Sequence, residues 1–483
     1  MNLAAHVLRN RFPGRTALVC GEEWLTWDEL AGRVARAAGA WRALGVRPGE
    51  QVLLVMPDTP GFAAAWLGAI HAGAVAVALN SRLSEADYRH IRADSRARFA
   101  LVDEAFPAAR QAFAGIATKL APAEPVPPFE ASPDAAALGL YSSGTTGRPK
   151  GILHAHRVAL SVGEAFRTLR LREGDCVFTT SRFFFSYGLE HSLLAPLALG
   201  VTALLCPDWP EAESVLRIVE RHRPQAMFSV PTVYRRLLAE RPELLQPLRE
   251  VRYFVAAGER LSPQLVRQWR ASVGGEILNL YGTSEAFCAC MMTPPGSSDG
   301  VRTGIPFPIA QVRLLATDGR EVPEGEPGVL WLRHPALARG YVNLPDETQN
   351  QFHDGWFCSR DLFLRDAQGY YLHQGRSDDL VKIAGQWVWP AELEEAALSD
   401  AAVAEAACVP VADGEGLHRL ALFVTARGRT DPAAAAVRAC ERLPRHKRPK
   451  WVRVLAELPR TATGKVQRFK LREILERELG ASG

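Results

Sequence analysis

The 483-residue sequence has few of the features that mark several large classes of protein. Its eight cysteines are scattered, the nearest pair is Cys288-x-Cys290, and no pair has the spacing of a zinc site. Scattered cysteines are typical of reduced thiols in a cytoplasmic protein. A net charge of +4 is too small over this length to indicate a protein that binds nucleic acid.

Long apolar runs are also missing. Residues 1–21 contain arginines and no continuous apolar core, so we expect no secretion signal. The longest weakly polar stretch, residues 62–79, is mostly alanine and glycine and is interrupted by His71. We interpret it as a helix over residues 60–71 and a strand over residues 74–79, separated by a turn, rather than as a membrane span.

What is present is an ordinary globular composition, with 47% hydrophobic and 23% charged residues. Helix-like and strand-like segments alternate in the first hundred residues. Residues 25–44 and 84–92 have the pattern of helices, and residues 49–56 and 99–102 have the pattern of buried strands. Such alternation is typical of parallel strands that are joined by crossover helices.

The most informative stretch is Tyr-Ser-Ser-Gly-Thr-Thr-Gly-Arg-Pro-Lys-Gly, residues 141–151. Residues 135–141 predict a strand before it, and residues 154–166 predict a helix after it. Its glycines let the backbone approach a ligand closely, and its hydroxyls, N–H groups and lysine suit a polyphosphate. Gly147 is too close to Lys150 for the common Gly-x-x-x-x-Gly-Lys-Ser/Thr phosphate loop. A flexible surface loop is the alternative interpretation.

The loop closely resembles the phosphate-binding loop of the acyl-adenylate-forming enzymes, which include acyl-CoA synthetases, adenylation domains of peptide synthetases and beetle luciferases. Five elements, the loop among them, follow in the order of this family. The resemblance implies an α/β fold with a large N-terminal adenylation domain, residues 1–376, of two doubly wound subdomains and a small β-barrel. A small mobile α+β domain, residues 377–483, would follow. The ATP contacts that it implies in the loop are Ser142, Ser143, Gly144, Thr145, Thr146, Gly147 and Lys150.

A second element, residues 182–188, places four aromatic residues within five positions. Such clusters more often belong to a core than to a ligand site. In the family this position lines the pocket for the acid, and Phe-Phe-x-Tyr-Gly-Leu is particularly similar to the benzoate-CoA ligases. A flat aromatic wall suits an aromatic acid. The pocket residues implied are Phe185, Ser186, Tyr187, Gly188, Ala256 and Ala257, and Gly258 and Glu259 continue toward the adenine.

The third element is Asn-Leu-Tyr-Gly-Thr-Ser-Glu, residues 279–285. It is similar to the family's Tyr-Gly-x-Thr-Glu, and Ser284 keeps the hydroxyl where threonine is usual. The resemblance implies that Tyr281 stacks on adenine, that Asn279 reaches the amino edge of the base, and that Glu285 binds Mg²⁺. The Tyr-Gly pair departs from the benzoate-CoA ligases, which leaves the exact acid open. The remaining ATP contacts implied here are Gly282 and Thr283.

The fourth element spans residues 375–382 and follows a Ser-Arg-Asp segment that matches the family's Gly-Asp pair. The resemblance implies that Asp361 accepts hydrogen bonds from the ribose hydroxyls and that Arg376 also contacts the ribose. It makes Asp378 the hinge between the two domains. Arg360 stands where glycine is usual in the family.

The C-terminal region carries the last element, Leu-Pro-Arg-Thr-Ala-Thr-Gly-Lys, which matches the family's terminal lysine element almost letter for letter. By this resemblance Lys465 is the catalytic lysine of adenylate formation. A basic run over residues 442–470 is either a solvated face or a surface for coenzyme A phosphates. The coenzyme A contacts implied are Gly385, Gln386 and Trp387, and the catalytic groups implied are Lys465, Glu285, Ser284 and Lys382.

The resemblance implies an enzyme that uses ATP, Mg²⁺ and coenzyme A to activate a small aromatic carboxylic acid. Benzoate or a hydroxy- or aminobenzoate is the first interpretation of the substrate. The alternatives are loading of the same acid onto a carrier-protein thiol, a ligase for another small acid, and a binding protein without activity. We expect a cytoplasmic monomer or homodimer without nucleic-acid or membrane partners.

Overall fold

The computed structural model describes residues 1–9, 12–143, 148–316, 318–379, 381–383, 386–414, 417–428, 431–460 and 466–480. The chain forms two compact units. The larger consists of Met1–Arg313, Trp331–Ser359 and Asp366–Leu372, and the smaller of Leu314–Leu330, Arg360–Arg365 and His373–Gly483. A mixed α/β fold with a large N-terminal and a smaller C-terminal part confirms the predicted fold class. The predicted domain boundary at residue 376 stays a prediction.

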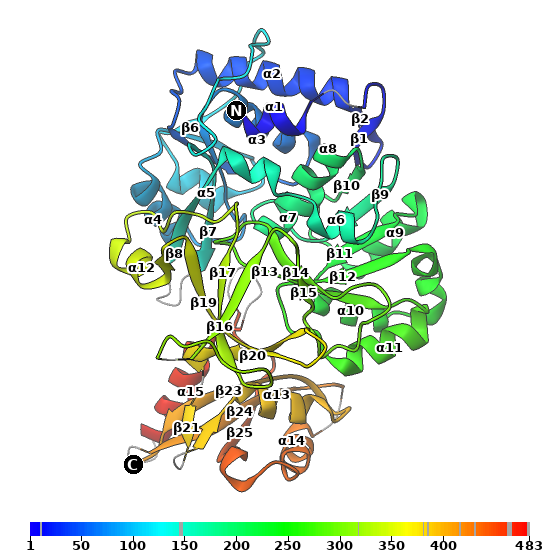
Figure 1. Ribbon diagram of the computed structural model, residues 1–483, viewed down its shortest axis with the longest axis vertical. Helices are drawn as coiled ribbons and strands as arrows, with labels where there is room; N and C mark the ends of the chain where they lie inside the picture. The colour runs from blue at the N-terminus through cyan, green and yellow to red at the C-terminus, as the bar shows by residue number, and fades with distance from the viewer. Residues whose placement is uncertain are drawn as a thin grey trace. The chain divides into compact units, whose positions relative to one another are not determined.

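Two sheets organise the larger unit (Figure 1). The nine-stranded sheet has the order β15 (Ile305–Pro306), β14 (Ala289–Met292), β13 (Ile277–Gly282), β12 (Tyr253–Ala256), β11 (Ala226–Ser229), β9 (Cys176–Thr179), β10 (Thr202–Leu205), β1 (Thr16–Cys20) and β2 (Glu23–Thr26). The six-stranded sheet has the order β6 (Ala117–Thr118), β5 (Phe99–Val102), β3 (Gln51–Val55), β4 (Val75–Ala78), β7 (Ala136–Ser143) and β8 (Pro149–Ala155). The strands from β13 to β1 and from β6 to β7 are parallel, as the alternating pattern predicted.

The main core contains side chains of both sheets and of the helices packed with them. These helices are α1 (Leu3–Val7), α2 (Trp27–Ala43), α3 (Pro60–His71) and α8 (Ala195–Leu199). Helix α2 begins with a capping box in which Thr26 and Glu29 satisfy each other's backbone N–H groups. Nearly every side chain of α3 is buried, which explains why its sequence lacks a polar face.

Further helices cover the outer faces of the two sheets. Helices α9 (Ala212–His222), α10 (Pro231–Leu238) and α11 (Pro263–Val273) pack on the nine-stranded sheet (Figure 1), and α4 (Glu85–Ser95) and α5 (Pro107–Ala112) pack on the six-stranded sheet. The parallel strands are therefore covered on both faces, which is the usual requirement for a parallel sheet. The carboxyl ends of β7, β12 and β13 carry or lead into three of the predicted site segments, at Ser142, Ala256 and Asn279.

Another sheet contains five strands. Its order is β16 (Gln311–Leu315), β17 (Gly328–Arg333), β19 (Trp356–Arg365) and β18 (Phe352–His353), and β20 (Tyr371–Arg376) pairs with β19. Helix α12 (Pro345–Gln351) precedes β18.

The smaller unit contains a three-stranded sheet of β23 (Val403–Ala412), β24 (His418–Ala426) and β25 (Trp451–Val454). Helices α13 (Pro390–Leu398) and α14 (Pro432–Cys440) share a core with one face of this sheet. Helix α15 (Arg468–Gly480) shares a core with the other face. The smaller unit also contains a hairpin of β21 (Val381–Ile383) and β22 (Gln386–Val388).

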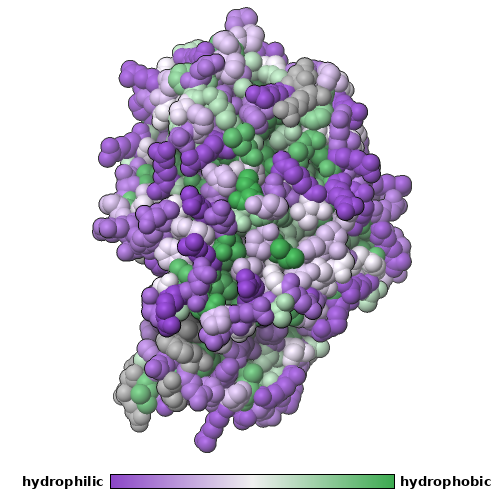
Figure 2. All heavy atoms as spheres, viewed as in Figure 1, coloured by the Kyte–Doolittle hydropathy of each residue, from purple (hydrophilic) through white to green (hydrophobic). Residues whose placement is uncertain are grey.

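Hydrophilic side chains cover most of the face in Figure 2, with smaller apolar patches between them. Among the described residues, none of the helices has the length and apolar character that crossing a membrane requires.

Candidate active site

The predicted phosphate loop joins β7 to β8, which are antiparallel and pair Ser142 with Lys150. The predicted helix over residues 154–166 is wrong, because Pro149–Ala155 is a strand and a 3-10 turn at His156–Leu160 follows it. Buried and partly exposed positions mix along β8, as they do on a strand with one face in the core. The loop therefore connects the two strands of a hairpin and does not lead directly into a helix. The contacts of its N–H groups, hydroxyls and Lys150 with a polyphosphate stay a prediction.

The second strand of the hairpin is joined to a segment that lies far away in the sequence. The backbone N–H of Val342 donates to the carbonyl of Gly151 at 2.9 Å, and Tyr341 forms a β-bridge with Ile152. A Cβ atom on Gly151 would lie 3.0 Å from both the Tyr141 ring and the Val342 side chain. Glycine at this position therefore allows the two backbones to approach.

Tyr341 connects the phosphate loop to the predicted metal ligand. Its hydroxyl donates to Oε1 of Glu285 at 2.7 Å, and its ring centre lies 5.8 Å from Nζ of Lys150. Lys150 forms an ion pair with Glu347 of α12, and its side chain is only 12% exposed. The predicted phosphate lysine and the predicted metal carboxylate are thus connected through Tyr341, and Glu347 pairs with the lysine; the sequence analysis named neither Tyr341 nor Glu347.

The turn that carries Ser284 and Glu285 is supported from the core. Nε2 of His154, on β8, lies 2.9 Å from the carbonyl of Ser284, and the His154 ring lies 5.4 Å from the ring of Phe287. Phe287 has a φ of +59°, a left-handed conformation that the buried packing holds in place. Burial lowers the pKa of His154 to about 4, so the imidazole is neutral at physiological pH.

The predicted acid pocket contains both core and wall residues. Phe183 and Phe184 are 1% and 7% exposed and belong to the core, as the composition of the segment indicated. Phe185 and Tyr187 are partly exposed, and Tyr187 belongs to the short helix α7 (Ser186–Leu189). The Tyr187 hydroxyl lies 3.3 Å and 3.4 Å from the carbonyls at the ends of β11 and β12. The aromatic wall is therefore tied to the carboxyl edge of the parallel sheet.

Buried charges fix the start of this segment. Nε of Arg182 lies 3.2 Å from Asp58, which follows β3, and Asp58 also accepts the backbone N–H of Phe183 at 3.1 Å. The Arg182 guanidinium donates to the carbonyls of Cys206 at 2.7 Å and Asp208 at 2.6 Å. Buried ion pairs of this kind are stable when such additional hydrogen bonds satisfy the charged groups.

A second buried charge fixes the end of the segment. Glu190 is 1% exposed and opens a π-helical turn, Glu190–Leu194, directly after α7. Its carboxylate accepts the N–H of Ala289 at 2.9 Å and that of Gly163 at 3.4 Å. Burial raises the pKa of Glu190 to about 7. Since Ala289 ends the turn that carries Glu285, this carboxylate links the acid-pocket segment to the predicted metal ligand.

The small residues predicted at the pocket floor follow β12. Ala256 and Ala257 are buried, and Gly258 has a φ of +80°, where glycine is the least strained residue. Glu259 accepts hydrogen bonds from the backbone N–H of Thr232 at 3.0 Å and from its hydroxyl at 2.7 Å. Its carboxylate thus contacts the start of α10, and its proposed role toward the nucleotide stays a prediction.

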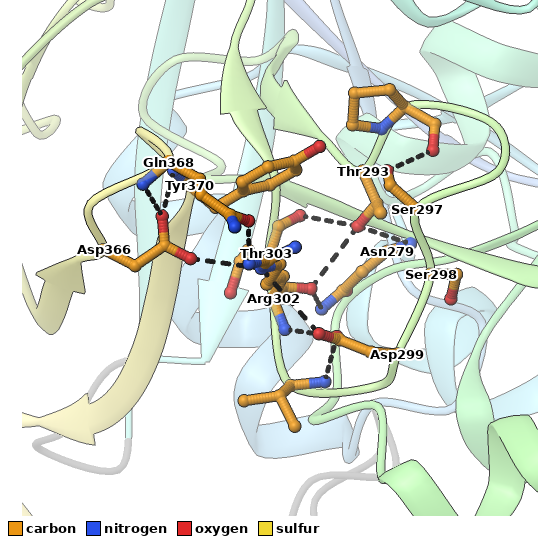
Figure 3. A network of polar contacts seen from close by, with 12 residues as sticks. Asn279, Thr293, Ser297, Ser298, Asp299, Arg302, Thr303, Asp366, Gln368 and Tyr370 are labelled. Atoms are coloured by element: carbon orange, nitrogen blue, oxygen red, sulfur yellow. Dashed lines mark hydrogen bonds and ion pairs between the residues drawn. The ribbon is translucent and has the colours of Figure 1, made fainter.

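Figure 3 shows the polar network around Asn279. Its backbone N–H donates to the Thr293 hydroxyl at 3.3 Å, and its side-chain amide donates to the Arg302 carbonyl at 3.4 Å. The Arg302 guanidinium donates to Asp366 at 3.1 Å and lies 4.3 Å from the ring centre of Tyr370. Both the backbone and the side chain of Asn279 therefore hold strand β13, which carries the predicted adenine contacts.

In the smaller unit, the two predicted ribose contacts lie together. Nη1 of Arg376, on β20, is 3.4 Å from Asp361 on β19, and His373 is 3.6 Å from the same carboxylate. The predicted hinge residue Asp378 pairs with Arg376 at 3.1 Å. These residues from separate elements form one cluster, as a shared function predicts.

Arg360, the residue that replaces the family's usual glycine, has a φ of +59°. This conformation explains why glycine is favoured at the position, because an L-residue is strained there. The Arg360 guanidinium lies 3.6 Å from Asp378, and the Ser377 hydroxyl donates to the Arg360 carbonyl at 3.0 Å. These contacts hold the strained residue in place.

The predicted coenzyme A contacts belong to the β21–β22 hairpin, whose register pairs Lys382 with Trp387 and Ile383 with Gln386. Lys382 and Gln386 are exposed. Six predicted site residues lie outside the described residues: Gly144, Thr145, Thr146, Gly147, Gly385 and Lys465.

The AMP-binding enzyme family matches residues 5–342, and the AMP-binding enzyme C-terminal domain matches residues 392–465. The chain belongs to the AMP-binding enzymes. The family match confirms the resemblance to the acyl-adenylate-forming enzymes that the sequence motifs indicated. The phosphate-loop hairpin, the acid-pocket segment and the turn with Glu285 all fall within the larger matched region of this AMP-binding enzyme.

Several AMP-binding enzymes are similar over nearly the full chain. The 3-hydroxybenzoate–CoA/4-hydroxybenzoate–CoA ligase of Thauera aromatica is 38% identical over 96% of this chain and 95% of that protein. The 3-hydroxybenzoate–CoA ligase of Aromatoleum sp. (strain CIB) is 37% identical over 95% of this chain and 93% of that protein. A solved benzoate CoA ligase from Burkholderia xenovorans LB400 is 34% identical, with a TM-score of 0.89 over 98% of this chain and 100% of that chain.

The functional candidates that sequence reasoning missed are the groups that hold the predicted ones: Tyr341, Glu347, His154, Asp58 and Glu190. Most contact their partners across more than a hundred residues of chain, so no local motif marks them. The only signal for Glu190 was its place inside a long apolar stretch, where a charged residue is buried only when it is paired.

Proposed function

We propose that this AMP-binding enzyme is an acid–CoA ligase. It adenylates an aromatic carboxylic acid of the benzoate, hydroxybenzoate or aminobenzoate type and transfers the acyl group to coenzyme A. The products are an aryl-CoA, AMP and pyrophosphate. The observation that carries this proposal is the connection from Lys150 through Tyr341 to Glu285, which brings a cation and a carboxylate together beside the phosphate-loop hairpin.

The first step joins two anions. A carboxylate oxygen of the acid attacks the α-phosphorus of ATP, the bond from this phosphorus to the bridging oxygen breaks, and pyrophosphate leaves. Two unit charges about 4 Å apart repel by about 4 kcal/mol at an effective dielectric of roughly 20. Lys150 and the N–H groups of the hairpin offset this repulsion, and phosphoryl-type transfer needs positioning and charge stabilisation rather than a nucleophilic side chain.

The residues fit a Mg²⁺ ion that arrives with the nucleotide. Among the described residues there is no group of three or more His, Cys, Asp or Glu side chains that could hold a metal alone. Mg²⁺ in nucleotide sites takes one or two carboxylates and completes its shell with phosphate oxygens and water. Glu285, oriented by Tyr341, would supply the carboxylate, and the ion would neutralise phosphate charge when bound.

The aromatic nature of the acid is supported by the wall at Phe185 and Tyr187 and by the names of the relatives. Ala256 and Ala257 at the end of β12 are small, and the Tyr187 hydroxyl lies 3.4 Å from the carbonyl of the preceding Val255. Flat rings pack well against such aromatic side chains. The similar ligases of Thauera and Aromatoleum are named for hydroxybenzoates, which differ from benzoate by one polar group.

The second step forms the thioester. The coenzyme A sulfur attacks the carbonyl carbon, the bond from this carbon to the phosphate oxygen breaks, and AMP leaves while the thiol proton passes to solvent. We assign Lys465 to the first step and Lys382, Gly385, Gln386 and Trp387 to the second. An electropositive site favours the thiolate, which is the attacking form.

Pyrophosphate exchange into ATP, screened across acids with Mg²⁺ present, tests the proposal directly. We expect benzoates to support exchange and short aliphatic acids of equal charge to support far less. A screen in which aliphatic acids exceed every benzoate would contradict the aromatic substrate. The acceptor is tested separately with free coenzyme A and with a phosphopantetheinylated carrier protein, of which only the former is expected to release AMP rapidly.

A further inference from the structure

The ammonium of Lys150 has a carboxylate partner that comes from a distant part of the chain. Lys150 lies near the start of β8, and it forms an ion pair with Glu347 in the first turn of α12. The side chain of Lys150 is only 12% exposed, and that of Glu347 is 28% exposed. A lysine with so little access to water needs a partner for its charge. Glu347 therefore provides, from within the chain, the anion that the proposed function expects from a phosphate group.

Other contacts hold the backbones that carry these two charges. The segment before α12 is joined to β8 through the hydrogen bond of Val342 with Gly151. It is joined to α4 through Asn343, whose side-chain amide donates to the carboxylate and to the backbone carbonyl of Asp94, each at 2.9 Å. Asp94 also accepts a hydrogen bond from the hydroxyl of Tyr141 on β7 at 2.8 Å. These hydrogen bonds remain when the ion pair is broken, so its two side chains can change partners without a movement of the backbone.

The two partners differ in how much each depends on the other. Glu347 lies in the first turn of α12, where the helix dipole favours a negative charge, and it is the more exposed of the two. Lys150 is less exposed, and the ring centre of Tyr341 lies 5.8 Å from its Nζ. The carboxylate can therefore be left to water, whereas the ammonium requires another anion. A phosphate group that approaches Lys150 provides one.

We infer that Glu347 competes with polyphosphate for the Lys150 ammonium and thereby sets the affinity of the enzyme for ATP. This inference rests on the proposed function, which assigns Lys150 to the phosphates of ATP. The carboxylate weakens nucleotide binding because it neutralises the charge that attracts the phosphates. Lys150 exchanges one anionic partner for the other when ATP binds, and the reverse exchange accompanies the release of pyrophosphate. Glu347 acts on the phosphates through Lys150 and is not itself a catalytic residue.

Matched substitutions isolate the charge of Glu347. Glu347→Gln removes this charge and keeps the shape of the side chain and an oxygen that accepts a hydrogen bond from Lys150. Asp346→Asn is the control, because it changes the net charge by the same amount one residue earlier on α12, at an exposed position. Glu347→Gln is also combined with Lys150→Ala, which removes the ammonium on which the inference depends.

The measurement is the dissociation constant of ATP, of pyrophosphate and of adenosine, by titration calorimetry with Mg²⁺ present. We expect Glu347→Gln to bind ATP and pyrophosphate more tightly than the wild type by about threefold to tenfold, the range expected for a partly exposed ion pair. Adenosine, which carries no phosphate, should bind equally to both proteins. Asp346→Asn should bind all three compounds within about twofold of the wild type, because solvent and salt screen an exposed charge. In the Lys150→Ala background, Glu347→Gln should change none of the three constants.

Unchanged or weaker binding of ATP and pyrophosphate by Glu347→Gln overturns the inference, since the carboxylate then orients the lysine instead of competing for it. An equal gain in Asp346→Asn, or a gain that persists in the Lys150→Ala background, also overturns it, because the effect then does not pass through the ion pair. Thermal unfolding identifies a folding defect, and Glu347→Ser, which also lacks the charge, replaces Glu347→Gln if that variant does not fold.

Failure of the proposed function gives a different result. A chain that binds neither ATP nor pyrophosphate overturns both the inference and the proposed function. A chain that binds them with the expected affinities, but supports pyrophosphate exchange with no acid, overturns the proposed function alone.

Discussion

The candidate groups of the larger unit and those of the smaller unit are held in place by different interactions. In the larger unit, Glu190 is 1% exposed and its carboxylate is fixed by backbone N–H groups. In the smaller unit, Arg376 and Asp378 form an ion pair whose side chains are 38% and 41% exposed. Buried polar groups with backbone partners are costly to displace, whereas exposed ion pairs contribute about 0–1 kcal/mol each. The larger unit is therefore suited to hold one geometry, and the smaller unit to exchange partners.

In the smaller unit, ion pairs also hold side chains of the basic run over residues 442–470. The ion pairs are Lys447–Glu392, Lys450–Asp413, Arg453–Glu478, Arg460–Glu405 and Arg468–Glu394. The acidic partners all lie outside the run in sequence. Five of the cations of the run thus have acidic partners from other segments, which favours the interpretation of the run as a solvated face over a dedicated phosphate surface.

The largest effect on activity is expected from a substitution in the smaller unit. This substitution should slow adenylate formation without slowing thioester formation to the same extent. Lys465→Ala should lower adenylate formation by about a hundredfold to a thousandfold, because one charged group that stabilises the transition state is lost. Thioester formation from supplied acyl-AMP should change by about threefold or less. Single-turnover assays of each step measure this, with Lys470→Ala as control. Equal loss in both steps would contradict the assignment of Lys465 to adenylation alone.

Glu190→Gln tests the buried polar groups of the larger unit. Burial raises the folded-state pKa of Glu190 from 4.5 to about 7. As the pH rises through this interval, the unfolded chain releases the proton first, so the free energy of unfolding falls by up to about 3 kcal/mol. Glutamine does not titrate, so the variant should gain stability relative to the wild type between pH 5 and pH 8. Denaturant unfolding across this range measures the difference, and a difference that does not vary with pH contradicts the assigned pKa.

Tyr341→Phe removes the hydrogen bond that orients Glu285 but keeps the ring beside Lys150. We expect kcat/KM for ATP to fall by about tenfold at limiting Mg²⁺, which corresponds to the loss of one hydrogen bond to a charged group. The defect should become smaller as Mg²⁺ is raised, since the carboxylate remains present. Pyrophosphate exchange as a function of Mg²⁺ provides the measurement, and Tyr253→Phe on β12 is the control. A defect that is independent of Mg²⁺ would assign Tyr341 to packing.

The sequence was sufficient for elements that a local pattern marks, such as the helices and strands predicted in the first hundred residues. The roles of the segments around Tyr187 and Glu285 stay predictions, and the ion pair of Asp361 with Arg376 was not predicted, although both were named as ribose contacts. The helix predicted over residues 154–166 rested on apolar side chains at a spacing that suits a helix, but residues 154 and 155 end strand β8, which pairs with β7, and a 3-10 helix over His156–Leu160 follows.

Long-range contacts could not be predicted in the same way. Lys150 and Glu347 are 197 residues apart, and Tyr341 and Glu285 are 56 residues apart, so their pairing depends on the whole fold.

The smallest effect, a change in stability, is expected from substitutions at Arg360. Both the family motif and the structure single out this residue. The motif marked it as a replacement of glycine, and the structure gives the reason in a φ of +59°. Arg360→Gly and Arg360→Ala both remove the exposed ion pair with Asp378, so their difference isolates the backbone. We expect the glycine variant to be more stable than the alanine variant by about 1 kcal/mol, because alanine retains the strain of a left-handed conformation.

At Arg365, on the same strand and without a positive φ, the order should reverse, since glycine weakens an ordinary strand. Thermal unfolding of the four variants measures both differences. If alanine is as stable as glycine at position 360, the backbone there is not strained, and the family's glycine must serve the ligand rather than the chain. In that case Arg360 would be expected to raise KM for ATP, and Arg360→Gly would lower it.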